Sequence, residues 1–512
     1  MLVINIPADG LFLAVEHRVS GELSAERCKA AVCEYIDRFL EAKPDVILLN
    51  VCYRRALTPS EVFDSYLYDI ETDEEGFAVK NEAGESVKRP APVSGGLSKY
   101  FTSFFSCARR LLEKGIDIYE YAVSHIRASR CRVFLSVRMN DAHYTENPAV
   151  NSSFALKNER ENTIGGRGEY LDFSRPAVRN YYRAYIEELL ERYAVDGIEL
   201  DWLRYPTVLP EEKRGDKRII SDYMKALRTL SDRYGAMLAV RMLPTEEENL
   251  AEGFDACGWI GEGLVDILTV ENFYIPTNYE LPIAAWRQSI EKRNEAKHPY
   301  RLLCGSDWGV SCVPRYSIAI TPAYVRGFAK TCLENGADGV YLFNFFEEED
   351  ESSFELSVGE NGAPFLKNCF STRLEAAQEP DALPRRYVHI GNKNSRYPIT
   401  LQAGDGYAFR MKMHRPFESR TLTIGCDTNV CPDVYVNNSL LKGAKTEPIL
   451  SGYEYIPKEE LGKYLFIYAI SQAAPFVFSI GIPGDIPEDA LVEIKNASGG
   501  AAEILWIEVV CE

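Results

Sequence analysis

The sequence has few of the residues on which metal-dependent and nucleophilic enzymes rely. Only 6 of its 512 residues are histidine, and none stands in an H-x-H or H-E-x-x-H pattern. No G-x-S-x-G marks a serine nucleophile. The sequence also lacks G-x-G-x-x-G and G-x-x-x-x-G-K, the motifs of the usual dinucleotide-binding and phosphate-binding turns. We therefore expect neither a metal nor a cofactor.

Other absences concern the cell compartment and the binding partners. The 13 cysteines run from Cys28 to Cys511 without a C-x-x-C spacing, which favours free thiols in a reducing compartment. The sequence shows no signal peptide pattern and no apolar stretch of membrane-spanning length, so we expect a cytoplasmic protein outside membranes. A net charge of −19 disfavours nucleic acid and anionic membrane surfaces as partners. The oligomeric state stays open.

Short apolar runs alternate with amphipathic helical stretches from residue 10 to about 347, which is typical of a parallel sheet in an α/β fold. Eight strand-helix units predict a (β/α)8 TIM barrel over residues 1–377. The predicted strands are 11–16, 46–53, 132–140, 197–201, 237–243, 265–273, 301–307 and 339–345.

Two connections and the C-terminal part depart from this repeat. Residues 54–98 and 141–172 are longer than a barrel needs, and we expect them to form cleft walls or a lid, with plain surface excursions as the alternative. Beyond a linker, residues 385–512 contain short alternating runs such as YAFRMKM and ILWIEVV, which predict a C-terminal all-β sandwich domain. That domain could bind carbohydrate or only cap the barrel.

The segment 196–206, DGIELDWLRYP, carries the clearest functional signal. Side chains alternate along a strand, so Glu199 and Asp201 point to the same face. Two carboxylates in an ordinary core would be costly, whereas the end of a barrel strand is the usual place for catalytic groups. In the alternative interpretation, Asp201 only pins a loop or pairs with Arg204.

Glycoside hydrolysis requires a pair of carboxyl groups, one on each side of the scissile bond. Asp201 and Glu271, at the ends of the fourth and sixth predicted strands, are the best pair. We expect Asp201 to stay ionised as nucleophile or stabiliser, and Glu271 to act as acid/base in its apolar surroundings. Glu271 could instead be a ligand contact or part of a structural ion pair.

The remaining strand ends are rich in polar and aromatic side chains, which suit an uncharged ligand with many hydroxyl groups. We therefore expect a carbohydrate substrate. The residues predicted to contact it are Glu16, His17, Tyr53, Arg54, Arg138, Asn140, Asp141, His143, Glu199, Trp202, Arg204, Tyr205, Arg241, Asn272, Tyr274, Asp307, Trp308 and Asn344.

Residues 170–206 resemble the core signature of the glycosyl-hydrolase-like family ten barrels, which are described as candidate glycosidases. The matching positions are Leu171, Asp172, Pro176, Val178, Arg179, Asp196, Gly197, Ile198, Asp201, Tyr205 and Pro206. The resemblance implies a TIM barrel and a functional carboxylate at Asp201.

The same strand is similar to the chitinase motif D-G-x-D-x-D-x-E, with Asp196, Glu199 and Asp201 in register. Leu203 stands where chitinases carry their catalytic Glu, which argues against a chitinase mechanism. Our leading hypothesis is a glycosidase acting on an oligo- or polysaccharide. A carbohydrate-binding barrel without turnover and, less favoured, a lyase or isomerase acting on a sugar acid are the alternatives.

Overall fold

The computed structural model describes residues 1–93, 99–273, 277–307, 309–313, 316–319, 322–344, 376–389, 397–413, 419–442, 445–447 and 476–512. The chain divides into two compact units. The first comprises Met1–Tyr274, Leu281–Gly305 and Asn335–Glu349, and the second comprises Ile275–Glu280, Ser306–Glu334 and Asp350–Glu512. No helix within the described ranges is long and apolar enough to cross a membrane.

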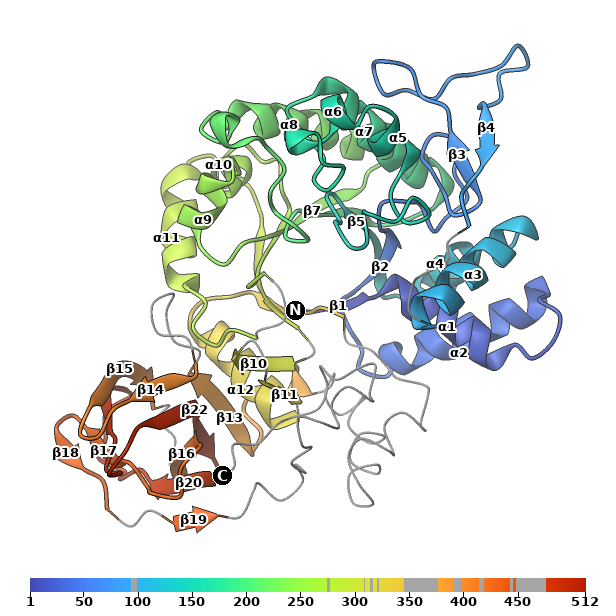
Figure 1. Cartoon of the computed structure of the whole chain (residues 1–512). Coiled ribbons are helices and arrows are strands. Elements are labelled where there is room, and N and C mark those ends of the chain that lie inside the picture. The colour runs from blue at the N-terminus through green and yellow to red at the C-terminus, as the bar shows by residue number, and fades with distance from the viewer. Residues whose placement is uncertain are drawn as a thin grey trace. The chain divides into compact units, whose positions relative to one another are not determined.

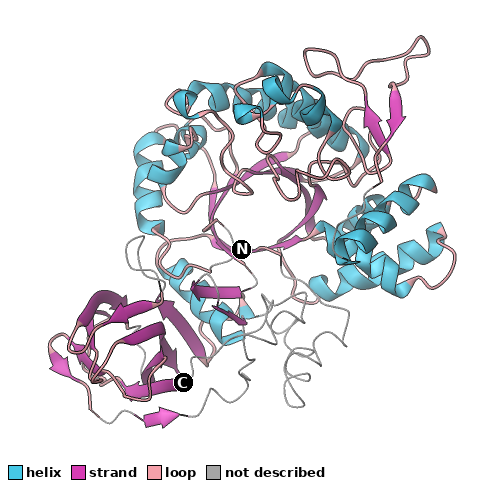
Figure 2. Ribbon diagram, viewed as in Figure 1, coloured by secondary structure: helices cyan, strands magenta, loops and turns pink. Residues whose placement is uncertain are grey.

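Eight parallel strands of the described chain close into a barrel, seen as a ring in Figure 1, with helices around the strand ring in Figure 2. The order around the ring is β1-β12-β9-β8-β7-β6-β5-β2, as expected for strands joined by successive crossover helices. The predicted TIM barrel is thus confirmed. The strands are β1 Leu2–Ile6, β2 Val46–Cys52, β5 Arg132–Arg138, β6 Gly197–Asp201, β7 Met237–Met242, β8 Ile267–Val270, β9 Arg301–Ser306 and β12 Gly339–Leu342.

The helices of the first unit lie between these strands along the chain. The longest, α7, begins at Pro176, where a proline without an N–H and with a helical φ is well suited to the first turn. The helices are α1 Ala8–Arg18, α2 Ala25–Leu40, α3 Lys99–Glu113, α4 Ile118–Ala128, α5 Ser153–Lys157, α6 Glu159–Asn162, α7 Pro176–Arg192, α8 Arg218–Arg233, α9 Glu246–Ala251, α10 Ala256–Gly261 and α11 Ile283–Arg293.

The first predicted strand is wrong. Residues 11–16 belong to α1, and the first strand is β1, whose five residues are all buried. Pro7 ends β1 because it cannot donate to the sheet ladder, and the helix begins directly after it. Most of the residues of α1 are buried, so its sequence shows no polar face that would reveal a helical period. The other seven predicted strands are present, β6 with the predicted limits and the other six with shifted ends.

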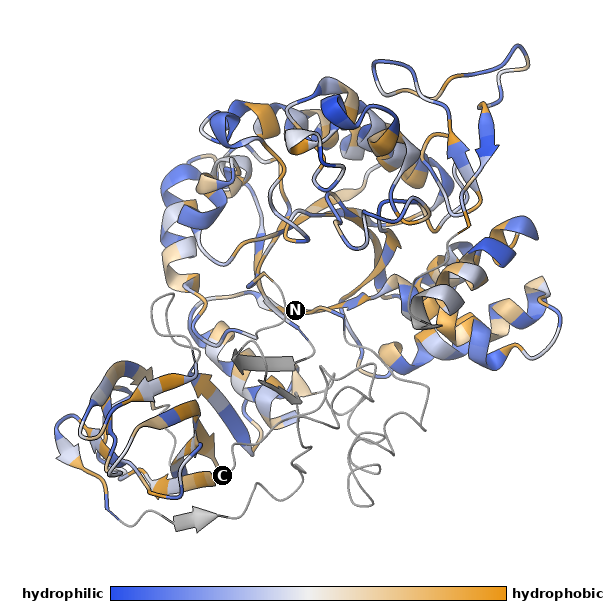
Figure 3. Ribbon diagram, in the orientation of Figure 1, coloured by the Kyte–Doolittle hydropathy of each residue, from blue (hydrophilic) through white to orange (hydrophobic). Residues whose placement is uncertain are grey.

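The interior of the barrel is a packed core below a polar upper layer. Inward-facing side chains form one cluster that includes Leu48, Phe134 and Tyr341, and the strands of the ring are mostly hydrophobic in Figure 3. At Gly197 a β-carbon would lie 2.6 Å from the Phe134 ring, so this position of the strand has no room for a residue larger than glycine. Toward the carboxyl ends of the strands the inward positions become polar, as Ser136 and Glu199 show.

Four aspartates connect the strands at the amino end of the barrel, and we call them the aspartate ring. Each directly precedes a strand: Asp45, Asp196, Asp266 and Asp338. Their side chains accept hydrogen bonds of 2.7–2.9 Å from the neighbouring strand, at the backbone N–H of Leu2, Val133, Leu238 and Leu302. Their carbonyl oxygens accept from the strand on the other side, at the backbone nitrogens of Arg132, Met237, Arg301 and Met1. All eight strands are thereby linked.

The second unit contains antiparallel sheets, which fit the predicted β-sandwich. One sheet has the order β13-β22-β16-β20-β19, with β14 also paired to β22, and the other has the order β15-β21-β17-β18. Their strands are β13 Arg385–His389, β14 Ile399–Leu401, β15 Gly406–Lys412, β16 Arg420–Cys426, β17 Asp433–Val436, β18 Ser439–Leu440, β19 Lys445–Glu447, β20 Phe476–Gly481, β21 Asp489–Lys495 and β22 Ala502–Cys511.

A helix and a hairpin that precede this part of the chain belong to the same unit. They are α12 Pro322–Glu334 and the pair β10 Gly309–Val313 and β11 Tyr316–Ala319. The Tyr324 hydroxyl of α12 donates to Glu508 of β22 at 2.8 Å, and a β-carbon at Gly327 would lie 1.9 Å from the Arg386 carbonyl oxygen. This helix therefore packs closely on the sheet. The domain limits at 377 and 385 stay a prediction.

Candidate active site

The two predicted catalytic carboxylates meet on one guanidinium at the carboxyl end of the barrel. Arg241 of β7 pairs with Asp201 of β6 in the sheet, and Glu271 directly follows β8. Arg241 Nε donates to Glu271 Oε2 at 2.8 Å, and Nη1 lies 3.1 Å from both Asp201 oxygens. No side chain of the three is more than 3% exposed. The guanidinium carbon also lies 3.5 Å from the centroid of the Phe343 ring.

The neighbouring strand leaves room for the Glu271 side chain. On β9, a β-carbon at Gly305 would lie 2.2 Å from Glu271 Oε2, so any larger residue would displace the carboxylate. Burial raises the pKa of Glu271, while Arg241 acts in the opposite direction. A raised pKa in a carboxyl group is what an acid catalyst needs near neutral pH.

Glu199 lies one layer below Asp201 on the same strand. Its Oε1 accepts hydrogen bonds from Ser136 Oγ at 2.7 Å and from the Tyr341 hydroxyl at 2.9 Å. Burial, and then repulsion by Asp201, raises the pKa of Glu199 to about 8. Glu199 is therefore mainly uncharged at pH 7, which avoids a further buried negative charge beneath Asp201.

A second polar network lies on the β5 side of Asp201. Asp141 accepts from Arg138 Nη1 at 2.9 Å and from His143 Nδ1 at 2.8 Å, and His143 Nε2 lies 3.2 Å from Arg204 Nη2. Burial opposes ionisation of Asp141, but these neighbours prevail and hold its pKa well below the usual range. The backbone N–H of Arg204 donates to Asp201 at 3.2 Å, which connects the two networks.

The Arg138 side chain makes all of its contacts described below within this network. Its guanidinium lies 4.4 Å from the centroid of the Tyr53 ring. The Asn50 amide, oriented so that its nitrogen donates to the Cys52 carbonyl, accepts from Arg138 Nε at 2.9 Å. Arg138 also pairs with Asp141. It is therefore a buried structural residue at the carboxyl end of the barrel, which we call the mouth, rather than a clamp exposed to a ligand carboxylate.

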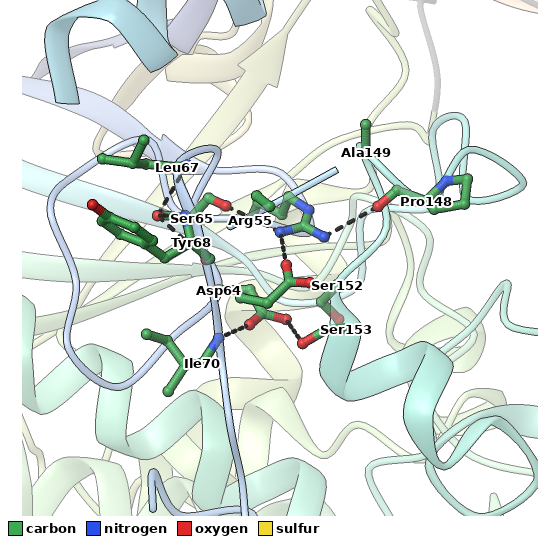
Figure 4. A network of polar contacts seen from close by, with 12 residues as sticks. Arg55, Asp64, Ser65, Leu67, Tyr68, Ile70, Pro148, Ala149, Ser152 and Ser153 are labelled. Carbon is green, nitrogen blue, oxygen red and sulfur yellow. Dashed lines mark hydrogen bonds and ion pairs between the residues drawn. The ribbon is translucent and has the colours of Figure 1, made fainter. Parts of the chain in front are cut away.

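The two long connections are joined to each other. Buried Arg55 donates to the carbonyls of Asn151 and Pro148 at 2.9 and 3.1 Å, and to Asp69 at 2.6 Å. Figure 4 shows this crossing, together with Asp64, which accepts from the Ile70 N–H and from Ser153 Oγ. The first connection also carries the hairpin of β3 Tyr68–Ile70 and β4 Lys88–Pro90. The pair thus forms one hydrogen-bonded wall, and its role in binding stays a prediction.

Aromatic rings form the more exposed part of the mouth, and we call them the aromatic rim. The Tyr205 ring lies 5.1 Å from His143, 5.6 Å from Phe273 and 6.2 Å from Tyr170, measured between centroids. Phe273 and Tyr144 are each 37% exposed. Tyr205 and Tyr144 have left-handed backbones, with φ of 62° and 54°, a strained conformation often found at functional sites.

Phe273, Tyr144 and Tyr170 of this rim are not among the contact residues that the sequence predicts. The signal for Phe273 was available, because it follows Glu271 and Asn272 directly after a barrel strand. Tyr144 and Tyr170 stand in the long connection 141–172, where no periodic pattern fixes a side-chain direction. The place of Tyr170 beside Tyr205 and of Tyr144 beside His143 could be seen only in three dimensions.

Several predicted contact residues lie elsewhere or face another way. Glu16 and His17 do not end a strand, since they stand in the last turns of α1, where Glu16 pairs with Arg110. Trp202 is buried against Phe173 and points away from the face of Asp201.

Three further predicted residues serve the loops or strand ends. Arg54 is buried and donates to the carbonyl oxygens of Asp141 and Glu169. Asn140 donates to the Tyr205 and Thr207 carbonyls and so braces the loop after β6. Asn344, with a left-handed φ of 51°, follows β12 and is 7% exposed.

Three other predicted contact residues, near the ends of the sixth and seventh predicted strands, are not placed at the mouth of the barrel by the described structure. Asp307 is buried in the second unit, where its carbonyl accepts from Thr277 at 3.1 Å. Tyr274 and Trp308 lie outside the described residues.

The residues of the family-ten-like signature divide into two groups. Asp196 and Gly197 serve the amino end of β6, through the aspartate ring and the packing of Phe134. Before α7, Asp172 accepts from the Ser174 N–H at 2.8 Å, and Arg179 Nη1 donates to the Phe173 carbonyl at 2.5 Å. These contacts fix the entry to α7. Among the residues matched, Asp201 and Tyr205 reach the mouth.

No family model matches the chain, and no curated protein matches it in sequence. Among solved structures it is similar to a cycloisomaltooligosaccharide glucanotransferase of Paenibacillus sp., at 10% identity over 99% of this chain and 57% of that chain, with a TM-score of 0.33. It is also similar to the PgaB (BpsB) glycoside hydrolase domain of Bordetella bronchiseptica, at 9% identity over 71% and 97% of the two chains, with a TM-score of 0.39. A tryptophan synthase of Mycobacterium tuberculosis matches at 11% identity over 73% and 91%, with a TM-score of 0.32. Such distant similarities, to proteins of different activities, assign no reaction.

Proposed function

We propose that this protein is a glycoside hydrolase that acts on a neutral oligo- or polysaccharide at the carboxyl end of the barrel. The observation that carries the proposal is the convergence of Asp201 and Glu271, from two different strands, on the guanidinium of Arg241. Two carboxyl groups at one place, in unlike surroundings, are what glycosidic cleavage needs. The aromatic rim beside them suits the apolar face of a sugar ring.

In this proposal the two carboxyl groups have different roles. Asp201, which receives two contacts from Arg241 and one from the Arg204 N–H, serves as nucleophile or stabiliser at the anomeric carbon. Glu271, with its raised pKa, donates a proton to the leaving oxygen and then takes one from water. A retaining outcome is the preferred form of the proposal, in which Asp201 forms and then releases a glycosyl-enzyme intermediate.

The test is turnover of aryl glycosides by Asp201→Asn and Glu271→Gln. We expect the Asp201 variant to lose activity by at least about 10³-fold on every substrate, because no nucleophile remains. The Glu271 variant should lose much less on a dinitrophenyl glycoside than on an alkyl glycoside, because a good leaving group needs no proton. Similar losses on both substrates would remove Glu271 as the acid.

Asp196→Asn is the matched control, since it changes an aspartate at the opposite end of the same strand. This variant keeps a side-chain oxygen for the Val133 N–H, and its turnover should stay within about twofold of the parent. If it loses activity as strongly as Asp201→Asn, the loss reflects disruption of β6 and the catalytic assignment fails.

One observation favours a second candidate, a carbohydrate-binding barrel without turnover. Asp201 and Glu271 are both buried and both already paired with Arg241, as in a structural ion cluster. Calorimetric titration with the same oligosaccharides separates the two candidates. Binding that is unchanged in Asp201→Asn, with no product from the parent protein, would favour the binding function.

A further inference from the structure

A cavity of about 490 Å³ lies on the outer side of the barrel, between α7 and α8. Arginine side chains reach it from both helices, Arg179 and Arg183 from α7 and Arg218 from α8, and Tyr223 of α8 also lines it. Trp202 packs against Tyr223 with centroids 6.4 Å apart. Because Trp202 and Asp201 point to opposite faces of the strand end, this cavity is separate from the mouth of the barrel.

Two donors that line this cavity have no acceptor within the part of the chain that the structure describes. Tyr223 is 4% exposed, yet its hydroxyl makes no hydrogen bond there. The Nε of Arg183 is also buried without a partner. Buried polar groups are nearly always hydrogen-bonded, so two unpaired donors that line one cavity call for an acceptor inside it.

The charged side chains around the cavity indicate that this acceptor is an anion. Arg179 and Arg183 are four residues apart on one helix face, where like charges repel each other. Burial lowers the pKa of Arg179, which means that its charge is costly in this place. Arg218 is already held by Asp216 through two bonds of 2.8 Å. Asp222 lines the cavity too and its charge partly offsets the effect of burial on Arg179, but the described residues show no ion pair between it and either α7 arginine.

We propose that this cavity binds the oxyanion group of a small ligand, a phosphate or a carboxylate, between Arg179, Arg183 and the Tyr223 hydroxyl. An oxyanion would relieve the repulsion between the two arginines and accept from all three side chains. The planar donors of arginine suit such a group better than a halide, which lacks separate oxygen atoms. The site is independent of carbohydrate cleavage at Asp201.

The experiment uses the full chain, titrated with sodium phosphate and, separately, with acetate and with sodium chloride at equal ionic strength. Calorimetry and thermal unfolding should show saturable binding and a rise in the unfolding midpoint with phosphate, with acetate, or with both, and not with chloride. A response to phosphate alone or to acetate alone identifies which oxyanion the site takes. Equal responses to all three salts would overturn the proposal.

Two variants locate the site. Arg183→Gln and Tyr223→Phe should each weaken oxyanion binding by about tenfold or more, because each removes a donor. Tyr223→Phe deletes only the unpaired hydroxyl, so the variant should fold at least as stably as the parent. Arg233→Gln on the same helix, whose arginine pairs with Glu187 at 2.6 Å, is the control and should bind normally. Undiminished binding in both site variants would overturn the assignment.

Discussion

Arg241 and Glu271 form a 2.8 Å hydrogen bond in a place where each side chain is at most 3% exposed. The same guanidinium holds Asp201, so one positive charge serves two buried carboxylates. Such a cluster is stable only while its cation is present, because an unpaired buried charge is strongly unfavourable.

Replacement of Arg241 by Met should lower the free energy of unfolding by about 3–5 kcal/mol at pH 8. The loss should be smaller at pH 5, because Glu271, whose pKa is already raised, can then take up a proton and lose its charge. Denaturant unfolding at the two pH values measures the difference. Arg241→Lys keeps a charge and should lose less. Equal losses at both pH values would contradict this account.

Glu199 should make the protein less stable as the pH rises. Its folded pKa of about 8 lies above that of an exposed glutamate, so the folded state binds the extra proton and stability falls between about pH 4.5 and pH 8. Each unit of pKa difference corresponds to about 1.4 kcal/mol. Glu199→Gln cannot titrate, and its stability relative to the parent should therefore improve over this range. A constant difference between the two proteins across these pH values would refute the assignment.

Loss of the Phe273 ring should weaken binding and leave the chemistry intact. In Phe273→Ala we expect KM to rise roughly fivefold, which corresponds to about 1 kcal/mol of ring contact, with little change in kcat. Phe77→Ala is the control, because Phe77 is 42% exposed in the connection that carries β3 and β4, outside the aromatic rim. A matching rise in KM for the control would mean that the rim has no special role.

Asp45 should contribute to stability alone. Asp45→Ala leaves the Leu2 N–H without its 2.7 Å partner and should cost about 1–3 kcal/mol of unfolding free energy, while turnover per folded molecule stays constant. Asp45→Asn retains an oxygen acceptor and should recover most of the loss. Parallel urea titrations and rate assays of the two variants give the answer, and a fall in kcat would speak against a purely structural role.

The sequence was most informative where local patterns determine the structure. The strand Gly197–Asp201 was predicted with its exact limits, because the apolar run is short and charged residues bound it. The run 11–16 was misread, because a helix buried on most sides has no amphipathic period. The true first strand, Leu2–Ile6, is five residues long and ends at a proline, a signal that the sequence did contain.

In the candidate site, too, local patterns predicted some features and left others undetermined. Alternation along a strand predicts that Asp201 faces the barrel interior. The same alternation places Trp202 on the outward face, so its prediction as a substrate contact is wrong. The link of Asp201 and Glu271 through Arg241 could not be predicted. It depends on the register of three strands, and no local pattern specifies the register between strands that are separated by helices.

The aspartate ring gives the barrel a cooperative lower edge. Each of its aspartates is bonded to both neighbouring strands, so no strand of the barrel can detach at that end without breaking bonds to an aspartate. Partial opening should therefore begin at the mouth and stop before the ring. In amide hydrogen exchange, the N–H groups of Leu2, Val133, Leu238 and Leu302 should exchange only when the whole barrel unfolds.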